Sequence, residues 1–531
     1  MARQPSQNEV QPLLNLYHSG QLPQLEVAAR ALLKNYPGLI IAHNLLGVAL
    51  EGQGKFAEAA DCYRKTLQYE PRIAEIHFNL GAALAHLGQT REAITSYRRA
   101  IELKPNLAVA HFNLGLALQA QGNLDEAIAS YRKAISLEPG FYEAYGSMGT
   151  ALQTQGKLEE AVAAYRKGLA IQPEPLGHFN LATALRDQGK LDEAVSSYRN
   201  ALALNPNYSE AYNNLGETLR DQGNMEEAVR NYHNALIANP DNSAASFNIG
   251  QFLYDAGRYE EAIPHFEKSQ REDWRERTLY CLYKTGRYEE FRERLQALAA
   301  EPNVLPFLAN LSAHHAANFG VEDTYNFCKN PLDFVYHSQI DELVDGSTLL
   351  NDLLRDVNFA EIAERKQGRL YHGIQSAGNL FKRPEESFRK LGELVRQKVR
   401  DYKQHYVGQD CIFMEEFPEE PEFSSSWYVK MNNGGHLTSH IHETGWLSGV
   451  LYLAIPARES GSTDGCIEFS MHGDNYPQQH DNFLTMIKEP AVGDIILFPS
   501  SLFHRTIPFS SDSERICVAF DIKPKSGLQQ V

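Results

Sequence analysis

Small, aromatic and proline positions recur with one period along the first half of the chain. The step between successive prolines is 34 residues, with a single step of 33. The prolines are Pro37, Pro71, Pro105, Pro139, Pro173, Pro206 and Pro240. Alanine and aromatic positions keep the same frame, from Ala59 and Tyr63 to Ala262 and Phe266. Because small residues let antiparallel helices approach and proline ends a helix, the pattern predicts stacked helix pairs.

The 34-residue frame resembles the tetratricopeptide repeat. The resemblance implies an α solenoid over residues 8–301, of about eight to nine repeats. A degenerate first repeat at 8–37 and a shortened last repeat that contains residues 286–295 would close its ends. The concave surface of such a solenoid commonly holds an extended chain, so we expect a protein or peptide partner in the repeat groove.

A column of asparagines runs along this frame, two residues before a recurring small residue. That residue is a glycine in most repeats, as at Gly81, Gly115, Gly216 and Gly250. The members of the column are Asn79, Asn113, Asn180, Asn214 and Asn248, and Ser147 interrupts the column. A side-chain amide carries both a donor and an acceptor, so a ladder of amides can pair with the backbone of an extended peptide. The column resembles the asparagine ladder in the repeat domain of O-linked N-acetylglucosamine transferase. The alternative is that these amides cap or bridge helices within the solenoid.

The pattern changes after residue 301. A helical junction is expected over 302–330, and strands and loops dominate 331–525, which indicates an α+β domain. Residues 384–406 space their apolar side chains for one helix face, and residues 516–520 alternate as a strand does.

Two histidine motifs in this domain carry candidate chemistry. His440 and His442 stand two residues apart in a run with strand-like flanks, so both imidazoles should share one face of a strand. His504 follows an apolar strand that ends in a proline turn. Histidine ligands suit iron, zinc, copper or nickel, and three protein ligands leave positions open for a substrate or oxygen. The sequence therefore predicts a metal site.

The motifs resemble the 2-oxoglutarate/Fe(II)-dependent dioxygenases, over roughly the last two hundred residues. The resemblance implies a double-stranded β-helix (jelly-roll) core, Fe(II) held by His440, His442 and His504, and 2-oxoglutarate as co-substrate. Arg515, eleven residues after His504, matches the arginine that binds the distal carboxylate of 2-oxoglutarate through two parallel hydrogen bonds. Cys517 stands where the family has a serine. His442 occupies the place of the usual carboxylate ligand, which removes one negative charge from the metal.

On this resemblance we expect a hydroxylase that acts on a protein or peptide recruited by the repeats. Two other interpretations stay open. A cupin-like three-histidine dioxygenase would use the same barrel without 2-oxoglutarate, although Trp446 or Leu447 stands where a cupin has its glutamate ligand. A non-catalytic repeat scaffold with a metal-binding or inactive barrel would explain the missing carboxylate.

Other histidines compete for these roles. His436 lies four residues before the first metal-site histidine and is a rival ligand or a supporting hydrogen-bonding group. His472 and His480 stand in a loop-like segment, so we expect them to be solvated. His314 and His315 are adjacent on a predicted helix and diverge by about 100°, so they should not share a metal easily.

Charge and composition narrow the range of expected partners and the expected cellular compartment. A formal charge of -17 argues against a general nucleic-acid binder, because phosphate contacts need a basic surface. No apolar run approaches the length of a membrane span, and the N-terminal residues lack the pattern of a secretory signal. Six cysteines without paired spacing suit a reducing compartment. We expect a cytoplasmic protein that binds neither nucleic acid nor membrane.

Overall fold

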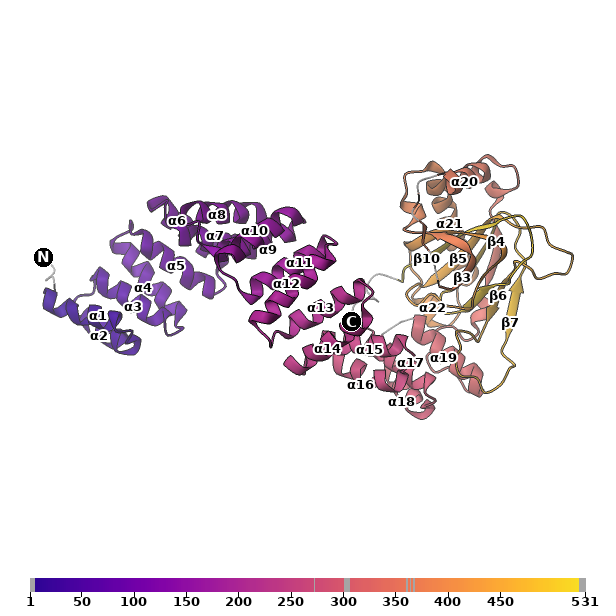
Figure 1. Cartoon of the computed structure of the whole chain (residues 1–531), viewed down its shortest axis with the longest axis horizontal. Helices are drawn as coiled ribbons and strands as arrows, with labels where there is room; N and C mark the ends of the chain where they lie inside the picture. The colour runs from indigo at the N-terminus through magenta and orange to yellow at the C-terminus, as the bar shows by residue number, and fades with distance from the viewer. Residues whose placement is uncertain are drawn as a thin grey trace. The chain divides into compact units, whose positions relative to one another are not determined.

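The computed structural model describes residues 5–271, 273–299, 306–359, 362, 364–365 and 368–524. The chain divides into two compact units, Met1–Ala245 and Ser246–Val531. Helices make up the first unit, and a β-rich region follows further helices in the second (Figure 1). The predicted boundary at 301/302 and the predicted end at 525 lie outside the described residues, so the domain limits stay a prediction.

Helix pairs build the first unit, as the repeat frame predicts. They are α1 (Gln7–His18), α2 (Leu22–Asn35), α3 (Ile40–Glu51), α4 (Phe56–Tyr69), α5 (Ala74–His86), α6 (Thr90–Leu103), α7 (Ala108–Ala120), α8 (Leu124–Leu137), α9 (Tyr142–Thr154), α10 (Leu158–Ile171), α11 (Pro175–Asp187), α12 (Leu191–Leu204), α13 (Ser209–Asp221) and α14 (Met225–Ala238). In the α7–α8 pair, a Cβ on Gly115 would lie 2.5 Å from the Tyr131 ring. Gly122, in the turn between them, has φ +79°, a left-handed conformation that favours glycine. The small residue and the aromatic residue of the frame therefore form one contact inside each such pair.

More helices precede and flank the β-rich region. They are α15 (Ser243–Asp255), α16 (Tyr259–Ser269), α17 (Trp274–Lys284), α18 (Tyr288–Ala299), α19 (Pro306–Phe319), α20 (Thr348–Phe359), α21 (Glu386–His405) and α22 (Ile412–Glu415), with 3-10 turns η1 (Pro331–Phe334), η2 (Asp341–Leu343) and η3 (Leu380–Lys382). Helix α21 confirms the predicted amphipathic helix, because it buries Phe388, Leu391 and Val395.

Two antiparallel sheets form the β-rich region. The strands are β1 (Tyr336–Gln339), β2 (Glu364–Arg365), β3 (Leu370–Ser376), β4 (Phe423–Leu437), β5 (Leu447–Ala454), β6 (Ile467–Ser470), β7 (Thr485–Lys488), β8 (Asp494–Pro499), β9 (Phe503–Thr506) and β10 (Arg515–Ile522). The larger sheet has the order β1-β8-β5-β10-β4-β3-β2, and the smaller has the order β7-β6-β9. Strand β10 pairs with β4 on one side and with β5 on the other, so it lies at the centre of the larger sheet.

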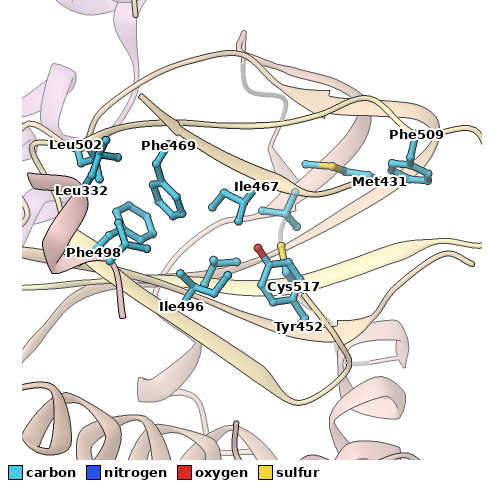
Figure 2. Close-up of a cluster of buried hydrophobic side chains, with 13 residues drawn as sticks. Leu332, Met431, Tyr452, Ile467, Phe469, Ile496, Phe498, Leu502, Phe509 and Cys517 are labelled. Atoms are coloured by element: carbon cyan, nitrogen blue, oxygen red, sulfur yellow. The ribbon is translucent and has the colours of Figure 1, made fainter. Parts of the chain in front are cut away.

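The core of this region lies between the two sheets. Ile467 and Phe469 of β6 in the smaller sheet meet Ile496 and Phe498 of β8 in the larger one (Figure 2). The Phe469 and Phe498 rings have their centroids 4.9 Å apart at 62°. Such edge-to-face packing adds to the free energy gained from burial alone. The same cluster continues toward Tyr452 and Cys517, which also face the candidate site.

Candidate metal centre

The first two predicted ligands lie in an irregular segment between β4 and β5. Strand β4 ends at Leu437, so the prediction that His440 and His442 lie within a strand is wrong. His440 instead forms an isolated bridge with His504 of β9, through two backbone hydrogen bonds of 3.1 and 3.0 Å. The backbone N–H of His442 donates to the carbonyl of Ser500 at 3.0 Å. Pairing with a distant segment thus brings the two motifs together.

Three imidazoles converge at this bridge. One ring nitrogen from each of His440, His442 and His504 lies within 4.8 Å of the others. The Nδ1 atoms are engaged elsewhere: that of His440 donates to the Thr438 carbonyl at 2.8 Å, and that of His504 donates to the Leu502 carbonyl at 3.1 Å. Because a carbonyl oxygen only accepts, the proton of these rings is on Nδ1 and the lone pair is on Nε2. A set of convergent Nε2 lone pairs fits a divalent transition metal.

Burial keeps His440 and His504 in the neutral form that binds a metal. Burial, followed by the neighbouring His442, lowers the pKa of His440 to about 3. Burial and the other two histidines hold the pKa of His504 well below its usual range. A neutral imidazole offers its lone pair at pH 7 without first losing a proton. The donor set therefore fits a bound metal, and it holds no carboxylate ligand.

A carboxylate lies directly behind one of the histidines. Asp521 of β10 accepts from Nδ1 of His442 at 2.5 Å, and its exposed fraction is 9%. Ser448 donates to the same carboxylate at 2.7 Å and Ser425 donates to it at 3.1 Å. Burial opposes the charged form, but His442 and the two serines hold the pKa of Asp521 below its usual value. We did not predict this residue from the sequence. Strand alternation was the available signal, because Asp521 shares a face of β10 with Arg515.

Arg515 lies in the same cavity as the histidines. This cavity measures about 500 Å³ and is lined by both motifs and by the inward face of β10. The guanidinium is 1% exposed; its Nε donates to the Gly465 carbonyl at 3.2 Å, and its Nη1 lies 3.5 Å from the Cys517 sulfur. Among the described residues no carboxylate pairs with it. The guanidinium carbon lies 5.0 Å from the centroid of the Tyr452 ring, and the buried Tyr452 hydroxyl has no hydrogen-bond partner in the described part of the chain. A buried positive charge that has no negatively charged partner among the described residues favours an anionic ligand.

The competing histidines have other roles. His436 stacks on Tyr371, with centroids 4.7 Å apart, and does not join the cluster. His472 and His480 are half-buried and do not join the metal cluster: His472 Nδ1 lies 2.8 Å from Nε2 of His314, and His480 Nε2 lies 3.1 Å from the Ala317 carbonyl. They attach the loop that follows β6 to helix α19.

His314 and His315 point to different surroundings, as their adjacency predicts. Nδ1 of His314 lies 2.7 Å from the Tyr283 hydroxyl. His315 packs against Phe291 and Phe319, and neither of its ring nitrogens has a hydrogen-bond partner among the described residues. The two rings therefore do not form a second metal site.

The asparagine column has contacts within the first unit. Asn113 lies beside the hydroxyl of Tyr97 in the preceding repeat, and Asn214 lies beside that of Tyr198 in the same way. Ser147 takes this role toward Tyr131. At these positions the amide bridges adjacent repeats, as the alternative interpretation expects. Contact between the column and a peptide stays a prediction.

Comparison with protein families matches both parts of the chain. Residues 425–521 match the family described as "Putative 2OG-Fe(II) oxygenase". Residues 243–273 match "Tetratricopeptide repeat", and residues 39–251 match "Cilia and flagella-associated protein 70 C-terminal domain". No curated protein matches the chain significantly. Among the described residues no helix is long and apolar enough to span a membrane.

Solved structures similar to the chain include repeat proteins. "Crystal structure of MamA" is 30% identical over 30% of this chain and 92% of that chain, with a TM-score of 0.29. "Crystal structure of YrrB: a TPR protein with an unusual peptide-binding site" is 22% identical over 35% of this chain and 96% of that one, with a TM-score of 0.32. "Crystal structure of APC/C hetero-tetramer Cut9-Hcn1" is 16% identical over 52% and 55%, with a TM-score of 0.36.

Proposed function

From a chain that joins tetratricopeptide repeats to a segment matching the 2OG-Fe(II) oxygenase family, we propose an Fe(II)- and 2-oxoglutarate-dependent dioxygenase. Its substrate is a protein or peptide that the repeats recruit. The observation that carries the proposal is one cavity that holds three convergent imidazoles and a buried arginine without an acidic partner. In this proposal the two-sheet arrangement is a double-stranded β-helix.

His440, His442 and His504 would hold the metal through Nε2. With molecular oxygen, bound Fe(II) and 2-oxoglutarate would supply the oxidising chemistry that converts a C–H bond into a C–OH bond: one oxygen atom enters the substrate, and the other is taken up by 2-oxoglutarate as it loses CO2. The protein's own part is to orient the rings, and each Nδ1–H is held by an acceptor on the opposite side of its ring. Imidazoles fixed in this way would present Nε2 to a metal without rearranging.

Arg515 would bind the distal carboxylate of 2-oxoglutarate. Its guanidinium can form two parallel hydrogen bonds with a carboxylate, and burial excludes competing water. Cys517 stands in the family's serine position, but a thiol is a weak donor. The unpartnered Tyr452 hydroxyl is the stronger candidate for a second hydrogen bond to the same carboxylate.

A carboxylate in the lining of the cavity favours a positively charged or N–H-bearing substrate group. Glu443 lines the cavity beside His442, is exposed, and has no ion pair among the described residues. Asp474 on the same lining is neutralised by Arg369 at 2.9 Å. Among the described lining residues, Glu443 is thus the carboxylate without an ion pair; burial raises its pKa, and the charge of Arg277 opposes this effect. A lysine, arginine or amide side chain of a peptide would complement it.

The test is an anaerobic titration of the Fe(II)-loaded protein with 2-oxoglutarate, followed by the visible charge-transfer band of the chelate. We expect a band in the wild type, loss or strong weakening of it in Arg515→Ala, and an unchanged band in Arg505→Ala. Arg505 is the matched control, because it is half exposed and pairs with Glu468 at 2.9 Å.

Other outcomes separate the alternatives. A band that survives in Arg515→Ala contradicts the role of that arginine. Iron that binds without any band favours the cupin-like dioxygenase. Failure of the wild type to bind metal leaves the repeat scaffold.

A further inference from the structure

The three candidate ligands differ in what lies behind them. His440 and His504 donate their Nδ1–H to neutral backbone carbonyls. His442 donates to the carboxylate of Asp521, at the shortest of the three distances. His442 is also the residue in the place where the related oxygenases have a carboxylate ligand. His442, the candidate ligand that replaces a carboxylate, is therefore also the one whose Nδ1–H is bound to a buried carboxylate.

Asp521 is held in this position by several contacts. Its Oδ1 accepts from His442 and Ser448, and its Oδ2 accepts from Ser425. Ser448 is itself held by Ser500 at 2.8 Å. Backbone pairing to Ser448 of β5 and Ser425 of β4 places Asp521 between the two serines. The side chain therefore has little freedom to turn toward another partner.

Direct ligation by Asp521 does not fit this geometry. Nδ1 and Nε2 lie on opposite sides of an imidazole ring, so a carboxylate bound to Nδ1–H lies behind the ring that faces the metal. The group of converging ligand atoms accordingly contains three histidines and no carboxylate among the described residues. Any effect of Asp521 on the metal must pass through His442.

We propose that Asp521 is a positioning residue that supplies the missing negative charge to the metal through His442. A carboxylate that accepts from Nδ1–H fixes the tautomer and ring orientation and increases electron donation by Nε2. The added negative charge tightens binding of a divalent metal and favours its more oxidised state. The inference rests on the metal site of the proposed function, but it is independent of 2-oxoglutarate.

Asp521→Asn tests the charge while keeping the shape. The asparagine carbonyl can still accept from His442, whereas the negative charge is removed. We expect the dissociation constant for Fe(II), measured anaerobically, to rise 10- to 100-fold, as is typical for such outer partners. We also expect the Fe(III)/Fe(II) midpoint potential to shift to a more positive value, a readout that a purely structural role would not move.

Asp494→Asn is the matched control. Asp494 is 8% exposed and pairs with His337 Nε2 at 2.8 Å, between β8 and β1 and away from the three histidines. The same substitution in a second aspartate–histidine pair, in which the aspartate is buried and the histidine is exposed, should leave both the Fe(II) affinity and the potential unchanged. An equal loss of affinity in Asp494→Asn would overturn the proposal, because the effect would then come from the fold.

Three further outcomes test the proposal. Wild-type Fe(II) affinity together with wild-type potential in Asp521→Asn would overturn the role of the carboxylate. If Asp521→Asn does not fold, Ser448→Ala replaces it: loss of one donor leaves the carboxylate on His442 and should move the potential by a smaller amount, and no movement contradicts the proposal. A wild-type protein that binds no Fe(II) refutes the proposed metal site itself. That result is distinguishable from an Asp521→Asn protein that behaves like the wild type.

Discussion

At the scale of single residues, burial decides which histidines can carry charge. His314 is 1% exposed and lies between the Tyr283 hydroxyl and the His472 ring. Burial, followed by the neighbouring His472, His315, His480 and Lys284, lowers the pKa of His314 to about 3. The ring thus stays neutral in the folded state at a pH where it is protonated in the unfolded chain.

This difference predicts a loss of stability in mild acid. A lowered folded-state pKa contributes stability that is present above the unfolded pKa of 6.5 and is lost as the pH falls below it. For His314 alone the loss between pH 8 and pH 5 is about 2 kcal/mol. His314→Gln should reduce the pH dependence of the free energy of unfolding by that amount, measured by urea titration of the full chain. Equal pH dependence in both proteins would contradict the assignment.

At the scale of elements, the glycine positions of one helix have opposite roles. In α9, a Cβ on Gly149 would lie 2.6 Å from the ring of Tyr165 in α10, whereas a Cβ on Gly146 would have no atom within 4 Å. Only Gly149 is required for close packing of α9 against α10. Gly146 only lowers helix propensity, since glycine is less favourable than alanine in a helix interior.

Alanine at these two positions should therefore change stability in opposite directions. Gly149→Ala overpacks the pair and should destabilise the repeats by about 1–3 kcal/mol. Gly146→Ala should stabilise them by up to about 1 kcal/mol. Urea unfolding followed by far-ultraviolet circular dichroism measures both. Similar effects of the two substitutions would show that the contact with Tyr165 is not what selects glycine.

At the scale of the whole molecule, metal binding belongs to one of the two compact units. The candidate ligands and all three tryptophans, Trp274, Trp427 and Trp446, lie in the second unit, Ser246–Val531. Tryptophan fluorescence therefore reports unfolding of that unit. A ligand that binds only the folded state stabilises it according to its concentration relative to its dissociation constant.

Anaerobic Fe(II) at about 100 times its dissociation constant should stabilise the fluorescence-detected transition by about 2.7 kcal/mol. The part of the helical signal that comes from the first unit should keep its midpoint, because none of the three histidines lies in that unit. His504→Ala should remove the shift. If both signals shift together in the wild type, the two units unfold as one.

Much of the fold and part of the site could be predicted from local pattern. The repeat period specified the helix pairs, because helical geometry converts a fixed spacing into a fixed face. The spacing of His440, His442 and His504 identified the three imidazoles that the structure brings together. Predictions that depended on one segment alone, such as α21, are confirmed.

Predictions failed where a distant segment supplied the partner. His440 and His442 lie outside a strand because they pair with the segment around His504. His472 and His480 are half-buried and not fully solvated, because each contacts helix α19. In each case local composition described the segment correctly but contained no information about what packs against it.

By itself, then, the sequence determined the repeats, the candidate ligands and the arginine. Each is specified by a residue type at a fixed spacing, and the geometry of a single helix or strand turns that spacing into a position in space. The tertiary structure alone decided that Asp521 lies behind His442, 79 residues away, and that Arg515 is buried with no acidic partner in the described part of the chain. These features depend on strand order, because β10 pairs between β4 and β5 and so places its inward face in the cavity. Strand order is a property of the packed chain, and no local spacing specifies it.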